Sequence, residues 1–471
     1  MRFALQLLAL SATVASIGAA PPADPLAALA AANGHPAGLH FRATGSRVVE
    51  GRTVTTTFDQ LGPTRLLERC IAGVCGGSWF DGAREWTYGL NEVALPEAVG
   101  ERTLMLRTLA AIASYAFAEP SFRSSGGTVT PAGADRWRVR ARDGFELIAV
   151  VDRATQSVAA VETAGGETLV TFGRQTKVNG ATFPLERGGP AEAGSLDGVS
   201  VVAGPLGPPA GVLAVFGHAA PLTLAAENVP IVPCSLGGHN LRCLLDTGAT
   251  PSAVTLPVAE ALNLEPHGEL EIVGFSRFAT GFIAAGPLVV GAARFAQARF
   301  AVVPRSRAAA FDVVVGSDLL GRVRLVLDRR QRTADVSAPG GPPGPNSVGL
   351  TFRSGSPLVP AQLGPQGVRA LLDTGDEAVV SFGYAQYRDG PQWPVVSRGQ
   401  AAGIAGAEDA FTVLVPEVQI GSLGLGPTRA LVRRTQADAH VGIGLWTRFV
   451  LDLDEQAERI SFAADTSKVR P

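Results

Sequence analysis

Alternating hydrophobic and polar residues, interrupted by tight turns, run through residues 36–186. The strongest turns are Asp81-Gly82, Asp143-Gly144 and Asn179-Gly180, dipeptides that favour two-residue β hairpins. The period changes between Glu101 and Ala118, where apolar residues recur on one helical face and Pro120 ends the pattern. We therefore predict an antiparallel β domain with one helix over this part of the chain.

Two tracts rich in Gly and Pro divide the remainder of the chain. They cover residues 187–211 and 338–347, and such composition is typical of linkers. They separate residues 36–186 from two C-terminal pieces, residues 212–337 and 348–467. Each piece is long enough to form a domain or a large lobe of one.

The N-terminus has the pattern of an export signal. Arg2 precedes the apolar run Phe3 to Ile17, and the small residues of Gly18-Ala19-Ala20 follow as a cleavage site. We expect residues 1–20 to be a signal peptide, residues 21–35 an N-terminal tail, and the protein to be periplasmic or secreted. An uncleaved signal anchor is the alternative, although the run is short for one. No later segment approaches the ~18 apolar residues of a membrane span.

The four cysteines fit an oxidising compartment, because an even count there usually means disulfides. Cys70 and Cys75 flank a short loop. Cys234 and Cys243 flank a turn over residues 237–240, and a hairpin closed there would place these two cysteines opposite each other. Neither pair has the spacing of a zinc site, and we expect no metal.

Charge and composition narrow the range of partners. The 471-residue chain has 40 Lys+Arg against 42 Asp+Glu, a formal net charge of −2. This balance gives no electrostatic reason to expect a nucleic acid or an acidic membrane as partner. Hydrophobic residues make up 46% of the chain and charged residues 17%, which is ample apolar material for large cores.

The two C-terminal pieces are related to each other. Residues 241–248 end in Asp246-Thr247-Gly248, and residues 368–375 end in Asp373-Thr374-Gly375, each after an apolar run. An apolar-apolar-Gly step follows at matching distance. Gly316 lies 70 residues after Asp246, and Gly442 lies 69 residues after Asp373. This register predicts a duplicated fold unit.

At these residues the chain resembles the aspartic peptidases, specifically two retropepsin-like lobes fused in one chain, as in bacterial exported aspartyl proteases. The resemblance covers about residues 225–465. It implies a mainly β fold with two acid-protease β-barrel lobes, which correspond to residues 212–337 and 348–467. It also implies an intramolecular pseudo-dimer that is active as a monomer on peptide or protein substrates without a cofactor.

The same resemblance assigns the site residues. Asp246 and Asp373 match the catalytic aspartates, and the residues that support them are Thr247, Gly248, Thr374 and Gly375. Two carboxylates held close together cannot both ionise, so they share one proton. One then acts as a base toward water and the other as an acid toward the scissile carbonyl. We therefore expect an aspartic endopeptidase.

Substrate is expected beneath two glycine-bearing hairpins, at residues 271–285 and 397–411. The cleft candidates are Gly274, Phe275, Phe278 and Gly403. The alternative is that these glycines are ordinary hairpin turns and the phenylalanines belong to the core.

One position departs from the family pattern. Asp376 follows Asp373-Thr374-Gly375 where the family has a small residue, as Ala249 is in the first lobe. If the Asp376 carboxylate points toward Asp373, like charge raises the apparent pKa values of the group. If it turns outward to solvent or caps a neighbouring turn, Asp376 has no effect on the dyad.

Two other functions remain open from the sequence. The lobes could be a degenerate scaffold that binds peptides in the envelope without cleaving them. The N-terminal domain faintly resembles lipoprotein-carrier-like half-barrels, which would imply a lipid or lipoprotein carrier. A serine or cysteine hydrolase is disfavoured, because the chain has no Gly-x-Ser-x-Gly elbow and its histidines, including His440, have no obvious nucleophile.

Overall fold

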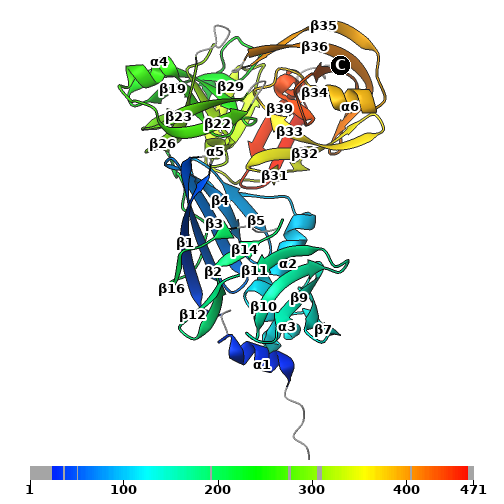
Figure 1. The fold of residues 1–471 in the computed structure, drawn as a ribbon. Coiled ribbons are helices and arrows are strands. Elements are labelled where there is room, and N and C mark those ends of the chain that lie inside the picture. The colour runs from blue at the N-terminus through cyan, green and yellow to red at the C-terminus, as the bar shows by residue number, and fades with distance from the viewer. Residues whose placement is uncertain are drawn as a thin grey trace, which may run out of the picture.

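A computed structural model describes the chain in seven stretches, residues 24–34, 38–49, 51–190, 194–273, 277–304, 310–403 and 406–464. The predicted signal peptide lies outside the described residues. In the tail, Pro25–Ala32 forms helix α1, with Asp24 accepting a hydrogen bond from the Leu26 amide at its start. Figure 1 shows the N-terminal domain at one end of the molecule and two β-rich lobes side by side at the other.

The N-terminal domain contains two large antiparallel sheets where the sequence predicted one. The first has the order β16-β1-β2-β3-β4-β5-β6. Its strands are β1 (His40–Val49), β2 (Arg52–Leu61), β3 (Thr64–Ile71), β4 (Val74–Phe80), β5 (Glu85–Tyr88), β6 (Leu95–Pro96) and β16 (Gly198–Val201). Long hairpins of neighbouring strands build this sheet, as the alternating pattern predicts.

The second sheet has the order β15-β14-β11-β10-β9-β8-β7. Its strands are β7 (Thr128–Gly133), β8 (Arg136–Arg140), β9 (Glu146–Asp152), β10 (Ser157–Thr163), β11 (Thr168–Phe172), β14 (Glu186–Gly188) and β15 (Gly194–Ser195). The ribbon β12 (Gln175–Val178) and β13 (Ala181–Pro184) completes the domain.

The predicted helix is shorter than its pattern. Helix α2 covers Glu101–Ala113 and packs its apolar face on the second sheet. Tyr115 then adopts a left-handed φ of 57°, which ends the helix before Pro120. The short helices η2 (Ala116–Ala118) and α3 (Pro120–Ser124) follow.

The tract 187–211 differs from the predicted linker. It contributes β15, β16 and most of β14 to the two sheets of the N-terminal domain. Short edge strands pair through their backbone, so a composition rich in Gly and Pro does not exclude them. The second tract does connect the lobes, and no helix or strand is found over residues 338–347.

Lobe 1 forms a ten-stranded sheet with the order β17-β25-β24-β19-β20-β27-β21-β26-β23-β22. The bounds are β17 (Ala214–Phe216), β19 (Ile231–Leu236), β20 (His239–Asp246), β21 (Ala253–Thr255), β22 (His267–Val273), β23 (Arg277–Ala285), β24 (Leu288–Val290), β25 (Ala293–Phe295), β26 (Ala298–Val303) and β27 (Val313–Gly316). The helices of this lobe are α4 (Leu256–Ala261) and α5 (Ser317–Leu320).

Lobe 2 forms an eight-stranded sheet with the order β31-β32-β33-β38-β34-β37-β36-β35. The bounds are β31 (Thr351–Arg353), β32 (Ser356–Leu363), β33 (Gln366–Asp373), β34 (Val380–Gly383), β35 (Val395–Gly403), β36 (Gly406–Ile420), β37 (Leu423–Arg433) and β38 (His440–Gly442). The helices are α6 (Tyr384–Asp389) and η3 (Ile443–Thr447).

The two lobes repeat one strand order. The run β19-β20-β27-β21-β26-β23-β22 in lobe 1 matches β32-β33-β38-β34-β37-β36-β35 in lobe 2. Helices α4 and α6 follow corresponding strands, β21 and β34. The predicted duplication is therefore a duplication of topology.

A six-stranded sheet joins the lobes. Its order is β18-β29-β28-β39-β40-β30, from β18 (Leu222–Thr223), β28 (Arg324–Asp328), β29 (Thr333–Ser337), β30 (Val348–Gly349), β39 (Phe449–Asp454) and β40 (Arg459–Ala464). One hydrophobic core runs through both lobes, and Val93 and Leu95 of the N-terminal domain belong to it. No helix of the described part of the chain is long and apolar enough to cross a membrane.

Candidate active site

The two Asp-Thr-Gly loops begin at corresponding strand ends. Asp246 ends β20 and pairs with Gly316 on β27, while Asp373 ends β33 and pairs with Gly442 on β38. Both pairings are parallel. Glycine is required behind each loop, because a Cβ on Gly316 would lie 2.4 Å from the Ala249 carbonyl oxygen, and Gly442 has an equally close backbone contact.

Two threonines lock the loops together. The Thr247 amide donates to Thr374 Oγ1 at 3.0 Å, and the Thr374 amide donates to Thr247 Oγ1 at 3.1 Å. Each hydroxyl also donates across the lobe boundary, Thr247 to the Leu372 carbonyl and Thr374 to the Leu245 carbonyl, both at 2.6 Å. Both threonines are buried, so these bonds fix the relative position of the aspartates.

The aspartates face each other across this junction. A Cβ on Gly248 would lie 2.4 Å from the Asp373 Cγ, and a Cβ on Gly375 would lie 2.6 Å from the Asp246 Cγ. Each glycine also donates its amide to the aspartate of its own loop, at 2.9 Å for Asp246 and 3.0 Å for Asp373. Each carboxylate therefore lies against the glycine of the other lobe, which places the two acids together.

The environment pushes the two carboxyl pKa values apart. Desolvation raises the pKa of Asp246 well above its ordinary value, and the charge of Asp373 adds to the rise. Desolvation also raises the pKa of Asp373, but the hydrogen bond and charge of His440 outweigh it and leave that pKa below its ordinary value. These opposite directions favour one ionised and one protonated carboxyl in the pair.

His440 is a site residue that the sequence reasoning missed. Its Nδ1 lies 3.0 Å from Asp373 Oδ2 and 4.0 Å from Asp376 Oδ2. It pairs with Leu371 on β33, and the corresponding partner of Leu244 in lobe 1 is Val314. An alignment of the two repeats on Gly316 and Gly442 would have shown that His440 takes the place of the apolar Val314.

Asp376 combines features of the two predicted alternatives, because its carboxylate lies within 4.8 Å of the Asp373 carboxylate and also caps the turn that follows it. Its carboxylate is buried, with 9% exposure, and accepts hydrogen bonds from the Ser381 hydroxyl and from the Ala378 amide at 3.0 Å. Arg433 Nη1 lies 3.5 Å away. Asp376 is thus a third acid near the dyad, and two basic side chains, Arg433 and His440, lie beside it.

Carboxylate and imidazole atoms of Asp373, Asp376 and His440 lie close enough together to hold a metal ion. The contacts already described use the same atoms, because His440 binds Asp373 and Ser381 binds Asp376. We therefore treat the three side chains as a hydrogen-bonded group.

The weaker cleft candidates are only partly placed. Gly274 and Phe275 lie outside the described residues. Phe278 on β23 pairs with Ile272 and packs against a hydrophobic cluster of lobe 1. Gly403 pairs with Gly406 near the tip of the β35–β36 hairpin. The described contacts of Phe278 and Gly403 do not join them to the dyad.

Both predicted disulfides are formed, Cys70–Cys75 and Cys234–Cys243. Cys70 and Cys75 are directly paired across the β3–β4 hairpin. Cys234 pairs with Leu241 instead, because the turn uses only Gly237 and Gly238. The second bridge is therefore diagonal across its hairpin, a correction to the predicted register.

Buried acids lie behind the loop of lobe 1. Ser317 Oγ donates to the Thr247 carbonyl at 2.8 Å and lies 3.4 Å from Glu455 Oε1. Burial, reinforced by neighbouring acids, raises the pKa of Glu455 to about 8. Asp318 accepts hydrogen bonds from Ser252 and, at 2.7 Å, from the side-chain amide of Asn91 in the N-terminal domain. No pattern in the sequence indicated these contacts, because they join distant segments.

Part of lobe 1 matches a known protein family. Residues 232–319 match the family described as Aspartyl protease. The solved structures that match include a retropepsin-like aspartic protease from Rickettsia conorii, at 16% identity over 26% of this chain and 94% of that one, with a TM-score of 0.21. An aspartic proteinase from Irpex lacteus matches at 11% identity over 54% of this chain and 99% of that one, with a TM-score of 0.34. A comparison with curated proteins gives no match.

Duplicated β lobes and paired Asp-Thr-Gly loops define the class of protein. The match of residues 232–319 supports an aspartic peptidase family for these lobes.

Proposed function

We propose that this protein is an exported aspartic endopeptidase that hydrolyses peptide bonds with water activated by Asp246 and Asp373. The observation that carries the proposal is the mutual contact of the two loops, in which each aspartate lies against the glycine of the other lobe. A degenerate binding scaffold has no need of two intact acids held this close. Because one chain supplies both halves, the proposed active form is a monomer.

The described environment supports a division of roles within the dyad. Asp373, with its lowered pKa, is ionised and takes a proton from the attacking water. Asp246, with its raised pKa, donates its proton to the carbonyl oxygen as the new C–O bond forms. The resulting diol then collapses and breaks its C–N bond: one of its hydroxyls returns a proton to Asp246 as the C=O bond forms, and the proton held by Asp373 passes to the leaving amine.

A mixed peptide library tests the proposal. The full chain is incubated with the library at several pH values, with and without a pepstatin-type inhibitor, and the products are identified by mass spectrometry. We expect inhibitor-sensitive cleavage that Asp246→Asn and Asp373→Asn each remove. Intact peptides at every pH, or the same products from both variants, would contradict the proposal.

Export and oligomeric state need separate measurements. N-terminal sequencing of protein from periplasm and medium should find a mature chain that starts near Pro21. Sedimentation should find an active monomer. A chain that keeps its first 20 residues contradicts export by cleavage, and activity confined to a dimer contradicts the intramolecular pair.

A further inference from the structure

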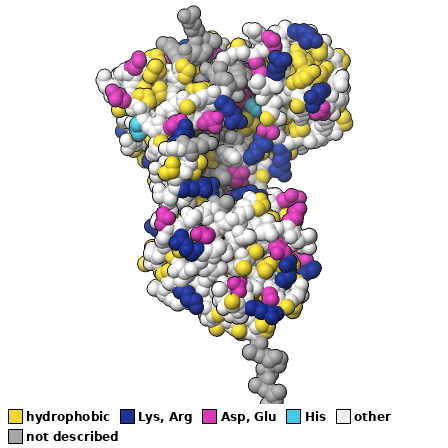
Figure 2. Space-filling view, viewed as in Figure 1, with side chains coloured by type: hydrophobic (Ala, Val, Ile, Leu, Met, Phe, Trp, Pro, Cys, Tyr) yellow, Lys and Arg dark blue, Asp and Glu magenta, His cyan; other side chains and the backbone are white. Residues whose placement is uncertain are grey.

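A cavity of about 600 Å³ lies where the N-terminal domain meets the two lobes. Its lining comes mainly from strands of the first sheet and from lobe 1, and Ser354 and Gly355 of lobe 2 complete it. Figure 1 shows the first sheet directed at lobe 1, and Figure 2 shows a narrow waist between the two parts, with basic side chains on its surface. The volume lies in the range of ~300–1,000 Å³ that is typical of ligand pockets.

The wall that the N-terminal domain contributes includes the tip of the β3–β4 hairpin. Ile71 and Val74 are directly paired across its turn, so their side chains lie on the same face of the hairpin. Both line the cavity, and Ile71 is 36% exposed. The next pair along the hairpin is the disulfide Cys70–Cys75, which ties the two strands together. The hairpin tip therefore holds two apolar side chains at the edge of the cavity.

This hairpin tip contacts the base of the β22–β23 hairpin of lobe 1. A Cβ on Gly268 would lie 2.6 Å from the Ala72 carbonyl oxygen, so only glycine allows this approach. Gly268 also has a left-handed φ of 70°. Arg52 binds Glu269 across the same boundary. The N-terminal domain thus forms a wall against β22 without any rearrangement of the chain.

The charged side chains of this lining already have partners. Glu269 is in the ion pair just described, and Glu271 Oε1 lies 3.5 Å from Arg277 Nη1. Asp318 takes part in the hydrogen bonds described for the buried acids, and Arg69 also interacts within the chain. An apolar ligand group gains by burial here, whereas a charged one would lose its water without a new partner. The cavity therefore suits apolar side chains.

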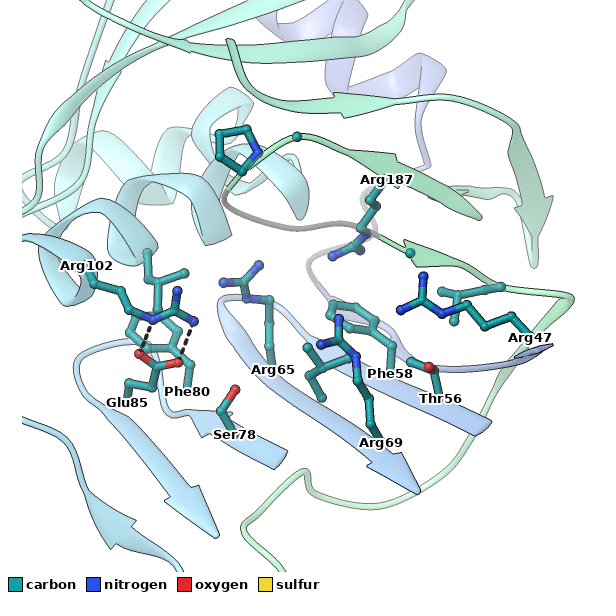
Figure 3. A pocket seen from close by; sticks show the side chains of 16 residues that line it. Arg47, Thr56, Phe58, Arg65, Arg69, Ser78, Phe80, Glu85, Arg102 and Arg187 are labelled. Carbon is teal, nitrogen blue, oxygen red and sulfur yellow. Dashed lines mark hydrogen bonds and ion pairs between the residues drawn. The ribbon is translucent and has the colours of Figure 1, made fainter. Parts of the chain in front are cut away.

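A second cavity, of about 420 Å³, lies over the face of the first sheet (Figure 3). All of its described lining residues belong to the N-terminal domain. Its arginines are engaged within the chain, as Figure 3 shows for Arg102, which binds Glu85 at 2.8 and 3.0 Å. Of the two cavities, the one at the junction is therefore the one that reaches the lobes.

The junction cavity begins beside the catalytic loop. Thr250 and Pro251 line it and follow Asp246 by four and five residues. Four residues of chain span at most ~15 Å, a length that an extended peptide covers in about four residues. Ala249 and Leu270 pack on one hydrophobic cluster, and Leu270 also lines the cavity. Apolar surface therefore continues from the catalytic loop into the cavity.

We propose that the junction cavity is a distal substrate subsite, in which the N-terminal domain helps to bind an apolar side chain of the peptide about four residues from the scissile bond. This inference rests on the proposed peptidase function and names a substrate feature that it would select. The other end of the cleft differs, because lobe 2 has the exposed Glu377 where lobe 1 has Thr250. The apolar preference should therefore occur on one side of the scissile bond.

Cleavage of a mixed peptide library by the full chain measures this preference. Mass spectrometry of the products gives the residue at each position around the cleaved bond. We expect Leu, Ile and Phe to be enriched at least about fivefold at one position, three to five residues from that bond. Ile71→Ser and Val74→Ser, at the hairpin tip, should each remove most of this enrichment and leave the positions that flank the bond unchanged.

The matched control is Val48→Ser. Val48 is a 71% exposed valine on β1, in the same sheet, and it lines neither cavity. This variant should keep the full enrichment of the parent chain.

Binding is measured separately on the full chain carrying Asp246→Asn, so that the probe stays intact. The probe is a fluorescein-labelled decapeptide that ends in Phe-Leu-Phe, and its sister peptide ends in Ser-Asn-Ser. We expect the apolar peptide to bind at least about tenfold more tightly by fluorescence anisotropy. Adding Ile71→Ser or Val74→Ser should remove most of this advantage, and adding Val48→Ser should not.

The other outcomes separate the two proposals. Unchanged enrichment in Ile71→Ser and Val74→Ser, or equal binding of the two decapeptides, overturns the subsite and leaves the peptidase function standing. Binding of fluorescein-labelled dodecanoate that depends on Ile71, without binding of the Phe-Leu-Phe peptide, overturns it in favour of a lipid site. If that peptide binds through Ile71 but the parent chain cleaves no library peptide, the peptidase function fails while the apolar peptide site stands.

Discussion

The two lobes share a backbone plan but surround their aspartates differently. Both lobes have the same strand order, the same Asp-Thr-Gly loop, the same threonine hydroxyl bond to the other lobe and a glycine behind the loop. Behind Asp246, lobe 1 has Val314 and Ala249. At the corresponding positions behind Asp373, lobe 2 has His440 and the buried Asp376.

This difference shows how a symmetric scaffold can produce an asymmetric site. The backbone alone gives both acids the same setting, and equal acids share a proton without preference. A single histidine on one lobe favours the ionised form of its own aspartate, which favours the proton on the other aspartate. The difference between the two aspartates therefore comes from neighbouring side chains, while the backbone fold of the two lobes stays the same.

The largest effect should come from replacing the aspartates. Asp246→Asn and Asp373→Asn should each lower kcat by about a thousandfold or more, because either one removes a partner in proton transfer. Their stabilities should differ, since Asn mimics the protonated Asp246 but deprives His440 of its anionic partner at Asp373. Peptide cleavage rates and Tm near pH 5 test both points. Equal Tm losses in the two variants would contradict the assigned proton.

The buried acid at the junction of the lobes should produce the next largest effect. Glu455 has an ordinary pKa near 4.5 when unfolded and about 8 when folded. Its neutral form favours folding below pH 4.5, and that contribution, on the order of 5 kcal/mol, is lost as pH rises toward 8. Glu455→Gln stays neutral and should flatten the fall of Tm between pH 5 and 9. Parallel Tm curves for the two proteins would rule out this role.

The reciprocal hydrogen bonds of Thr247 and Thr374 are the feature that the two lobes share, and replacing either threonine tests it. Thr247→Val and Thr374→Val should each destabilise the protein by about 1–3 kcal/mol, because each leaves a buried amide and a carbonyl without their partners. The two losses should be equal, and because the two threonines are in direct contact the cost of the double variant should depart from their sum. Urea unfolding measures all three, and strictly additive losses would show that the threonines do not act as a pair.

The smallest effect should come from removing the histidine that distinguishes lobe 2 from lobe 1. His440→Val gives lobe 2 the residue type that lobe 1 has at Val314. Without the histidine the pKa of Asp373 rises, so the acid limb of kcat/KM should move up by about 1 pH unit. His239→Val, at an exposed position of β20, is the control and should keep the parent profile. A His440→Val profile that superimposes on the parent would leave the dyad unpolarised by this residue.

The sequence was sufficient to locate the paired Asp-Thr-Gly loops and the two β-rich lobes that carry them. Asp246 and Asp373 stand out because the same local pattern occurs twice, and a local pattern can be recognised from the sequence alone. His440, Glu455 and the contact of Asn91 with Asp318 depend on segments brought together by folding. The strands of residues 187–211 were missed for a related reason, because their pairing uses backbone atoms that composition does not reveal.

The contribution of Val93, Leu95 and Asn91 to the lobes has a consequence for maturation. A zymogen whose N-terminal domain is cut away would lose two core side chains and a hydrogen bond to the buried Asp318 together. Such a loss leaves a cavity and an exposed carboxylate, so the excised enzyme would be less stable than its precursor. The packing therefore favours a chain that keeps its N-terminal domain as a permanent part.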